Sequence, residues 1–412
     1  MNRLLPGDTP LVKLHTDGTH RVAPLAETID RVRRHFGPLG ITRVADVTGL
    51  DRIGIPVVMV VRPNSRSLAV SQGKGTTLAA ARASGLMEAA ETHHAEHPPV
   101  PLRLATATDL ARTADVIATG LPVPAHSGFH PDLPMLWAEG TDLTSGAPVW
   151  VPYETVHTDY TVTDLPGAGC FYATSNGLAS GNHPREAVLH GLFEVVERDA
   201  TVLWSLAAPE TQDITRIDLA TVDDPGCRRL LDDFDRADVL VAVWDQTSDL
   251  GLPAFSCEII DRYANPLHVV PAAAGMGCHT DRGVALSRAL TEAAQSRLTA
   301  ITGSRDDQPP PAYARSHDLH ALAGHRAVLA DESPARRDFR QVPEIRHDTV
   351  DDDIADVCAR LAKAGCDRVV AVDLSRPEFG IDVVRVVVPG LEHVDLDSAE
   401  VMIGPRARQA MA

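Results

Sequence analysis

Two stretches of this sequence place pairs of glutamates inside segments that are otherwise apolar and favour long helices. Glu88 and Glu91 lie in A-S-G-L-M-E-A-A-E-T, and Glu194 and Glu197 lie in H-G-L-F-E-V-V-E-R. At about 100° per residue, the two members of each pair share one helix face. Because these segments are too apolar to be solvated faces, we expect several carboxylates to be drawn toward the interior. The fold must then pair them, keep them protonated, or bridge them with cations. The alternative is that each glutamate pairs with a nearby arginine or lies at the helix rim.

Three expected helices carry stripes of this kind, over about residues 76–97, 184–204 and 284–302. Asn182 is the expected cap of the second helix, and Pro184 suits its first helical position. The stripes are formed by Ser84, Glu88 and Glu91 in the first helix, by Asn182, Glu186, Glu194, Glu197 and the adjoining Arg198 in the second, and by Arg288, Glu292 and Gln295 in the third. By the same arithmetic, Arg297 points to the opposite side of the third helix.

The length of 412 residues exceeds the ~250–300 that one hydrophobic core usually serves, so we expect two or three subdomains. Strand-like runs lie at 56–61, 67–70, 147–153, 239–244, 254–260, 267–273, 368–373 and 382–388, and further helix-like runs at 226–236 and 352–364. Their alternation predicts an α/β chain of mixed α+β character, with long helices packed on mixed sheets. Residues 303–345 are charged and proline-rich, which favours a long surface excursion.

Convergence of the stripes would suit a hard cation. Mg²⁺ prefers oxygen ligands and usually shares carboxylates with substrate phosphates. Zn²⁺ is disfavoured because the six cysteines include no C-x-x-C pair. Cysteines scattered in this way are expected to be buried free thiols in a reducing compartment. Together with an N-terminal stretch that lacks the apolar region of a secretory signal, they predict a cytoplasmic protein.

The segment Ser71–Thr77, S-Q-G-K-G-T-T, lies between an expected strand and an expected helix. It is therefore a candidate loop for binding an anion at the helix N-terminus, with Lys74 as its cation. It is not a Walker motif, because the G-x-x-x-x-G-K-[ST] spacing is absent. The sequence also lacks G-x-S-x-G and G-x-G-x-x-G, which leaves hydrolase and dehydrogenase interpretations without support.

The charge balance argues against nucleic acid as a partner. The formal net charge is −18, and no basic run offsets it, so a polyphosphate backbone would be repelled by the average field. No apolar stretch approaches the ~20 residues that a membrane-spanning helix needs, so no membrane partner is expected either.

Four ordered motifs resemble those of the YcaO family. They are S-Q-G-K-G-T-T-L-A-A-A-R-A-S-G-L-M-E-A-A-E, S-N-G-L-A-S-G-N-H-P-R-E-A-V-L-H-G-L-F-E-V-V-E-R-D-A, S-R-A-L-T-E-A-A-Q-S-R-L-T and R-V-V-V-P-G-L-E. The resemblance runs from about residue 20 to 395. It implies a YcaO domain over 51–395 with an ATP site between its subdomains, a segment 1–50 that contributes to that site, and a tail over 396–412. It also implies ATP and Mg²⁺ as cofactors.

The same resemblance implies roles for the stripe residues. The Mg²⁺ ligands would be Glu88, Glu91, Glu186, Glu194 and Glu197. The nucleotide would be bound by Arg21, Thr28, Lys74, Ser84, Asn182, Arg198, Arg288 and Gln295. The catalytic residues would be Glu88, Glu194, Arg198 and Glu292.

The family resemblance implies ATP-dependent O-phosphorylation of peptide backbone amides in ribosomal peptide natural-product maturation. The sequence looks most like family members partnered with a TfuA protein, which form thioamides. It ends in I-G-P-R-A-R-Q-A-M-A without the proline-rich terminus of many azoline-forming members, and it has no fused leader-peptide-binding domain. We therefore expect a precursor peptide, a separate TfuA-like or leader-binding partner, and a homodimer. Azoline or amidine formation is the alternative of the same mechanism, and a non-catalytic, nucleotide-dependent peptide-docking scaffold is the alternative of another class.

Overall fold

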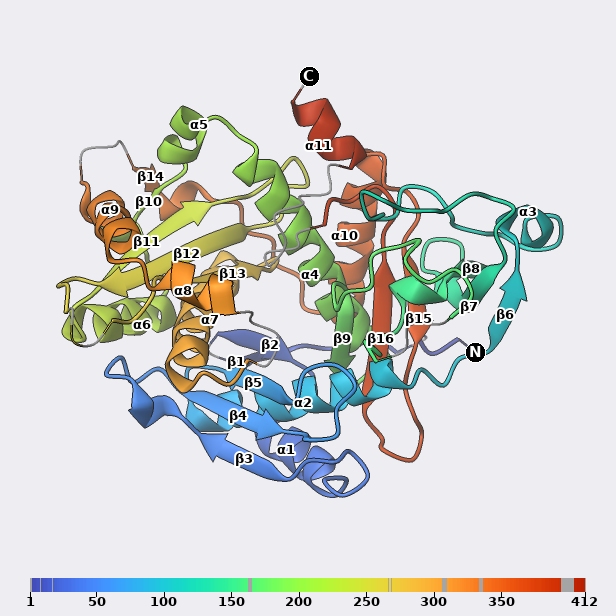
Figure 1. The fold of residues 1–412 in the computed structure, drawn as a ribbon, viewed down its shortest axis with the longest axis horizontal. Coiled ribbons are helices and arrows are strands. Elements are labelled where there is room, and N and C mark those ends of the chain that lie inside the picture. Colours follow the sequence, from blue (N-terminus) through green and yellow to red (C-terminus); the bar gives the residue numbers. More distant parts are fainter. Residues whose placement is uncertain are drawn as a thin grey trace.

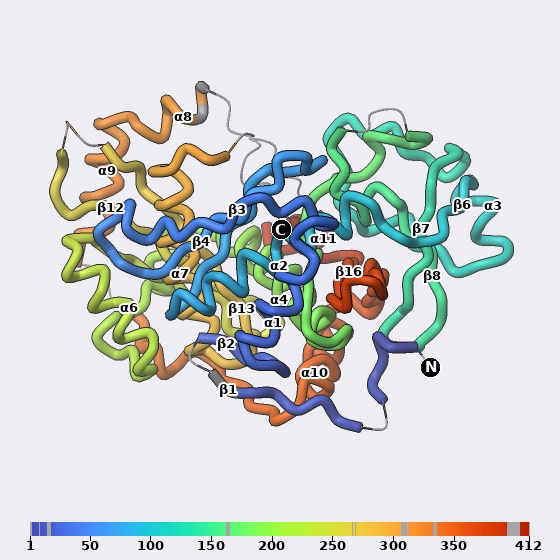
Figure 2. Tube along the Cα trace, turned by 90° about the horizontal axis from the view of Figure 1, so that it is seen from below, coloured from blue at the N-terminus to red at the C-terminus, as the bar shows by residue number. Residues whose placement is uncertain are grey.

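The computed structural model describes residues 2–7, 9–16, 18–161, 165–265, 267, 269–305, 310–332, 336–393 and 404–411. It consists of helices packed on several sheets, which confirms the mixed α+β class expected from the sequence. Both views place the largest sheet at one end of the molecule and the sheet β11–β12–β13 at the other, with α2 and α4 between them (Figures 1 and 2). Among the described helices, none combines the length and the apolar character needed to cross a bilayer.

The largest sheet has six strands, and its hydrogen-bonded neighbours all run antiparallel. Its strands follow the order β6–β7–β15–β16–β9, and β8 also pairs with β7. They are β6 (Leu102–Ala105), β7 (Met135–Asp142), β8 (Pro148–Pro152), β9 (Leu178–Gly181), β15 (Val370–Asp373) and β16 (Asp382–Val387). Helix α4 (Pro184–Ser205) packs on β9 and β16, and α10 (Val350–Lys363) packs on α4. One apolar cluster therefore joins α4 and α10 to this sheet.

Two further units repeat one arrangement of three antiparallel strands followed by a long helix. The first comprises β3 (Arg43–Asp46), β4 (Val57–Val61), β5 (Val70–Lys74) and α2 (Leu78–Glu96). The second comprises β11 (Val239–Asp245), β12 (Ala254–Asp261), β13 (Ala273–Cys278) and α7 (Arg282–Thr302). In each unit the helix packs on the third strand, and α1 (Leu25–Arg33) or α6 (Pro225–Arg236) packs beside it. We call these the first and second β₃α units.

Glycines in the third strand of each unit allow the strand and helix backbones to touch. A Cβ atom on Gly73 would collide with the carbonyl oxygen of Ala81 in α2, and one on Gly277 would collide with that of Ala285 in α7. Ser71–Thr77 is therefore not the loop that we expected, although its role in binding an anion stays a prediction. The segment is largely strand β5, and its glycines serve close packing.

Four other expectations were wrong in detail. The strand expected at 67–70 lies at Val70–Lys74, and the one expected at 267–273 lies at Ala273–Cys278. Both strands contain glycines, which are more typical of loops than of strands. Helix α4 is capped by the His183 side chain, which accepts from the N–H of Arg185, rather than by Asn182. Residues 303–345 are not merely a surface excursion, because they include α8 (Pro310–Ser316) and α9 (Leu319–Ala330).

The remaining elements are short. They are β1 (Leu14–Thr16), β2 (Thr19–Arg21), α3 (Ala107–Leu110), α5 (Pro209–Ile214), β10 (Ile217–Asp218), β14 (Arg337–Asp338) and α11 (Pro405–Ala410), with 3-10 turns at Thr48–Leu50, Tyr153–Thr155, Leu219–Thr221 and Phe339–Gln341. Part of the expected tail, residues 396–403, lies outside the described residues. The expected boundaries of the N-terminal segment, the central domain and the tail stay predictions.

Candidate active site

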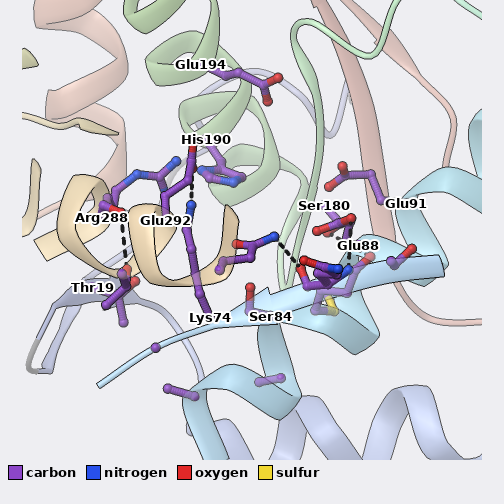
Figure 3. A pocket seen from close by; sticks show the side chains of 18 of the residues that line it. Thr19, Lys74, Ser84, Glu88, Glu91, Ser180, His190, Glu194, Arg288 and Glu292 are labelled. Atoms are coloured by element: carbon purple, nitrogen blue, oxygen red, sulfur yellow. Dashed lines mark hydrogen bonds and ion pairs between the residues drawn. The ribbon is translucent and has the colours of Figure 1, made fainter. Parts of the chain in front are cut away.

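A cavity of about 420 Å³ lies where α2, α4 and α7 face one another, beside β2, β5 and β9. Every candidate site residue named from the sequence lines it: Arg21, Thr28, Lys74, Ser84, Glu88, Glu91, Asn182, Glu186, Glu194, Glu197, Arg198, Arg288, Glu292 and Gln295. The close view shows side chains from all three helices directed at the space between them (Figure 3). The helix faces that the periodicity identified therefore surround one cavity.

Glu88 and Glu292 occupy matching positions in the two β₃α units. The N–H of Gln72 in β5 donates to Glu88 Oε1 at 3.2 Å, and the N–H of Met276 in β13 donates to Glu292 Oε1 at 3.3 Å. In both cases the donor lies sixteen residues before the glutamate. Each carboxylate is thus fixed by the strand that its own helix packs on, and each keeps a second oxygen for other contacts.

The surroundings of these two glutamates differ in charge. Burial raises the pKa of Glu88 to about 7. Burial also acts to raise the pKa of Glu292, but the charge of Lys74, followed by that of Arg198, outweighs it and lowers that pKa. Lys74 reaches from β5 across the cavity to form an ion pair with Glu292 (Figure 3). One glutamate is therefore readily protonated and the other is held as an anion.

Glu91 and Glu194 approach the same space from α2 and α4. Burial, followed by the charges of Glu194 and Glu88, raises the pKa of Glu91 well above its usual value. Burial and then Glu197 raise the pKa of Glu194 to about 7, against the opposing charge of Arg198. These carboxylates repel one another, so a bound cation would relieve both the repulsion and the desolvation.

The α4 stripe continues with Glu197 and Arg198. Glu197 is only 3% exposed, and among the described residues its Oε2 atom has no hydrogen-bond partner. Arg198 approaches Glu197 at 3.8 Å. Burial alone would lower the pKa of Arg198, yet Glu197 and Glu194 raise it, so the guanidinium stays charged. The orphaned carboxylate oxygen is a vacant acceptor at the edge of the cavity.

Asn182 and Glu186 tie the N-terminal segment to this site. Glu186 Oε2 accepts from the N–H of Val22 at 2.8 Å, and its Oε1 accepts from the backbone and side-chain amides of Asn182 at 3.2 Å. The hydroxyl of Thr28 donates to Asn182 Oδ1 at 2.9 Å. Both oxygens of Glu186 are thus already engaged, so its expected role as a metal ligand stays a prediction.

The described residues contain no preformed group of three or more His, Cys, Asp or Glu side chains that would hold a metal ion alone. Mg²⁺ usually binds through one or two carboxylates together with phosphates and water. The orphaned oxygen of Glu197 and the mutually repelling Glu91 and Glu194 are suitable donors. The residues therefore fit Mg²⁺ bound jointly with a polyphosphate.

Sequence reasoning missed several residues that line the cavity. His190 lies midway between Glu186 and Glu194 at four-residue spacing, which was the available signal. Burial, followed by the charges of Arg288 and Arg21, lowers the pKa of His190 well below its usual value, so the imidazole is neutral. Ser180 in β9 and Thr158 and Tyr160 in a loop also line the cavity. No periodicity marks those three.

Arg297 lies outside the cavity, as its helical phase predicts. It is 2% exposed and forms ion pairs with Asp51 at 2.8 Å and with Asp261 at 2.9 Å. The neighbouring Gln295 faces the cavity and donates to the carbonyl oxygen of Gln72 at 3.3 Å. The choice of Gln295 over Arg297 as the residue facing the cavity is thus supported by the geometry.

Acidic side chains from three helices, facing lysine and arginine across one cavity, define a site for a polyphosphate with a hard cation. The chain matches the family model described as YcaO cyclodehydratase, ATP- and Mg²⁺-binding, over residues 72–392. It therefore belongs to the YcaO family. ATP and Mg²⁺, the cofactors expected from the sequence, agree with that description.

Relatives and solved structures support this membership. An uncharacterized protein in the tfuA 3′ region of Rhizobium leguminosarum bv. trifolii is 40% identical over 411 residues, covering 95% of this chain and 93% of that protein. An uncharacterized protein of Methanothermobacter thermautotrophicus is 33% identical, and the match covers 94% of this chain and 98% of that protein. YcaO from Methanopyrus kandleri, bound with AMPPCP and Mg²⁺, superposes with a TM-score of 0.75 at 25% identity, covering 96% and 98%. A heterocyclase in complex with substrate and cofactor also superposes with a TM-score of 0.75, at 24% identity. That match covers 93% of this chain and 55% of the heterocyclase chain.

Proposed function

We propose that this chain uses ATP and Mg²⁺ to phosphorylate the oxygen of a peptide backbone amide, so that a nucleophile can replace that oxygen. The observation that carries the proposal is the convergence of Glu88, Glu194 and Glu292, from three different helices, on one cavity that also holds Lys74 and Arg198. A docking scaffold has no use for so many convergent charges, since each is costly to bury.

The residues divide by chemistry. Glu88, Glu91, Glu194 and Glu197 would hold Mg²⁺, which supplies charge neutralisation for the phosphates when bound. The nucleotide would contact Arg21, Thr28, Lys74, Ser84, Asn182, Arg198, Arg288 and Gln295. Lys74 would exchange its bond to Glu292 for one to a phosphate oxygen, because both are anions within its reach.

The proposed reaction has two steps. The amide oxygen attacks the γ-phosphorus of ATP, ADP leaves, and the amide carbon becomes bonded to a phosphorylated oxygen. A nucleophile then adds to that carbon, and inorganic phosphate leaves with the former amide oxygen. Phosphoryl transfer of this kind depends on positioning and charge neutralisation, which is what a cavity of fixed carboxylates and cations supplies.

Sulfur is the nucleophile that we favour, which makes the product a thioamide and the partner a TfuA-type protein. The location of one relative in a tfuA 3′ region supports this branch. The six cysteines are free, and none of them is among the described residues that line the cavity. Burial raises the pKa of Cys278 well above its usual value and that of Cys257 beyond reach of physiological pH. Sulfur would therefore come from sulfide or from the partner.

The test is co-production of the chain with candidate precursor peptides encoded near its gene, with and without a TfuA-type partner. Peptide-dependent ATP consumption and a peptide mass gain equal to sulfur minus oxygen are expected. Loss of one water from the peptide would instead establish the azoline or amidine alternative. ATP binding with neither turnover nor any peptide change would establish the scaffold.

A further inference from the structure

A second cavity, of about 220 Å³, adjoins the candidate active site. Its lining includes Met135, Leu136, Tyr153, Leu165 and Ala168. Tyr160 lines both cavities and is 48% exposed, so the two spaces meet at this residue. We refer to this space as the side cavity.

The wall between the two cavities is the segment 157–160. Thr158 lines the candidate active site, whereas His157 and Asp159 on either side of it line the side cavity. This alternation is what an extended segment gives. The N–H of Thr158 donates to the carbonyl oxygen of Ala95 at 2.9 Å, which anchors the wall to the C-terminal end of α2. The Arg66–Asp159 ion pair, at 2.6 Å, braces it from the other side.

The side cavity lies at the end of the active site away from the phosphate-binding cations. Lys74 precedes α2, and Figure 3 places it on the same side as Arg288. The lining then follows α2 from Ala80 past Glu88 to Thr92, about 18 Å along the helix axis. Beyond that point come Thr158 and Tyr160. A nucleotide whose phosphates lie near Lys74 would therefore leave the far end to the other substrate.

The charged groups of the side cavity are already satisfied. The oxygens of Glu154 accept from the N–H groups of Gly169 at 2.6 Å and Phe171 at 2.8 Å. Asp159 is paired with Arg66 and accepts from Thr161. Burial and then Arg385 lower the pKa of His157, so that imidazole is neutral. No charge on the described lining thus calls for a charged occupant.

The remaining surface is aromatic and apolar. The rings of Tyr153 and His157 lie 4.6 Å apart with an interplanar angle of 31°, which gives the cavity a flat wall. Met135, Leu136 and Leu165 complete the apolar lining. On the active-site side of the wall, the buried hydroxyl of Thr158 has no hydrogen-bond partner among the described residues. A peptide backbone is the kind of group that would engage it.

We propose that the side cavity is a specificity subsite, which accepts a neutral apolar or aromatic side chain of the peptide substrate next to the amide that is activated. The inference rests on the proposed function, because it assigns the peptide to the Tyr160 end of the site. Thr158 would bond to the peptide backbone, and Tyr160 would lie between the backbone and the bound side chain.

The test uses minimal peptide analogues and binding alone. The full chain is saturated with Mg²⁺ and AMPPCP, and N-acetyl-leucinamide and N-acetylglycinamide are titrated with ligand-observed NMR. The leucine compound is expected to bind about tenfold more tightly, as burial of one leucine side chain predicts. Equal affinities would overturn the proposal. Competition between N-acetyl-leucinamide and AMPPCP would also overturn it, since the cavity would then hold the adenine.

Two variants locate the binding. Ala168 is exposed at the side cavity, so Ala168→Trp should fill it and abolish the preference for leucine, while AMPPCP affinity changes less than about twofold. Ala111→Trp, at an exposed alanine that lines neither cavity, is the matched control and should keep the preference. Leu136→Ala enlarges the cavity and should shift the preference toward N-acetyltryptophanamide. A preference unchanged in both cavity variants would refute the subsite.

Failure of this proposal and failure of the proposed function give different results. A leucine preference that Ala168→Trp removes, in a chain that never couples any peptide to ATP turnover, supports the subsite and contradicts amide activation. Peptide-dependent turnover without any side-chain preference contradicts the subsite alone.

Discussion

Glu88 and Glu292 are equivalent residues of two β₃α units, and each accepts a hydrogen bond from the strand amide sixteen residues before it. The equivalence extends along both helices, because Ser84, Glu88 and Glu91 stand at the same offsets from the start of α2 as Arg288, Glu292 and Gln295 do from the start of α7. The two β₃α units thus present equivalent helix faces to the cavity. The face of α2 is acidic, whereas that of α7 carries basic, acidic and amide side chains.

Removing a charge from this cavity should abolish activity without loss of the fold. Glu88→Gln and Glu292→Gln are each expected to lower ATP turnover at least about a hundredfold, because a ligand or a counter-charge for the phosphates is lost. The exposed Glu139 provides the matched control, and Glu139→Gln should turn over ATP normally. Circular dichroism and thermal melts establish folding. Full turnover in the cavity variants would contradict the assigned roles.

The carboxylates with raised pKa values should make the ligand-free chain sensitive to pH. The pKa of Glu194 rises from 4.5 to about 7 on folding, so its neutral form stabilises the folded state fully below pH 4.5. That contribution is lost as the pH rises through 7. Glu194→Gln should therefore gain stability relative to the parent chain between pH 5 and 8, by up to about 3 kcal/mol. A difference in stability that is independent of pH would contradict this account.

Binding of Mg²⁺ and nucleotide should release protons for the same reason. Glu88 and Glu194 are partly protonated near pH 7 and would become anionic when they hold a cation. Calorimetry with AMPPCP and Mg²⁺ in buffers of different ionisation enthalpy measures the release. The number of protons should fall in Glu194→Gln and stay unchanged in Glu139→Gln.

Substitutions of Arg297 and Gln295, two polar residues of α7, should have different effects on stability and on nucleotide binding. Arg297→Met leaves Asp51 without its buried cation and Asp261 with only the half-exposed Arg52, and is expected to cost about 3 kcal/mol of unfolding free energy. Gln295→Ala should change stability by less than about 1 kcal/mol but weaken AMPPCP binding, because its side chain faces the cavity. Chemical denaturation and calorimetry measure the two effects. The opposite pattern would reverse the assigned orientation of α7.

The glycine contacts between strand and helix should be intolerant of a methyl group. Gly73→Ala and Gly277→Ala place Cβ against a helix carbonyl oxygen and should each cost more than about 3 kcal/mol. Gly128→Ala is the control, because no atom lies within 4 Å of the added carbon. Melting temperatures of the three variants test this, and equal values would show that the backbones do not touch.

The helices and their stripes were predictable because a 3.6-residue period fixes which side chains share a face. The same period distinguishes Gln295, which faces the cavity, from Arg297, which points away from it. The strands β5 and β13 were misplaced because their glycines, which allow contact with α2 and α7, look like loop residues in sequence. The side cavity was unpredictable, since it is assembled from β7, the Tyr153–Thr155 turn and irregular loops. No local pattern marks residues that only tertiary packing brings together.

Amide O-phosphorylation requires that the amide oxygen of the peptide leaves as part of inorganic phosphate. To test this, a precursor peptide that the chain modifies is labelled with ¹⁸O at the amide that reacts, and is incubated with the chain, ATP and Mg²⁺. The inorganic phosphate that forms is then analysed by mass spectrometry. Transfer of the label to phosphate, in step with peptide modification and absent in Glu88→Gln, is the expected result. Unlabelled phosphate formed alongside a modified peptide would contradict amide O-phosphorylation by this chain.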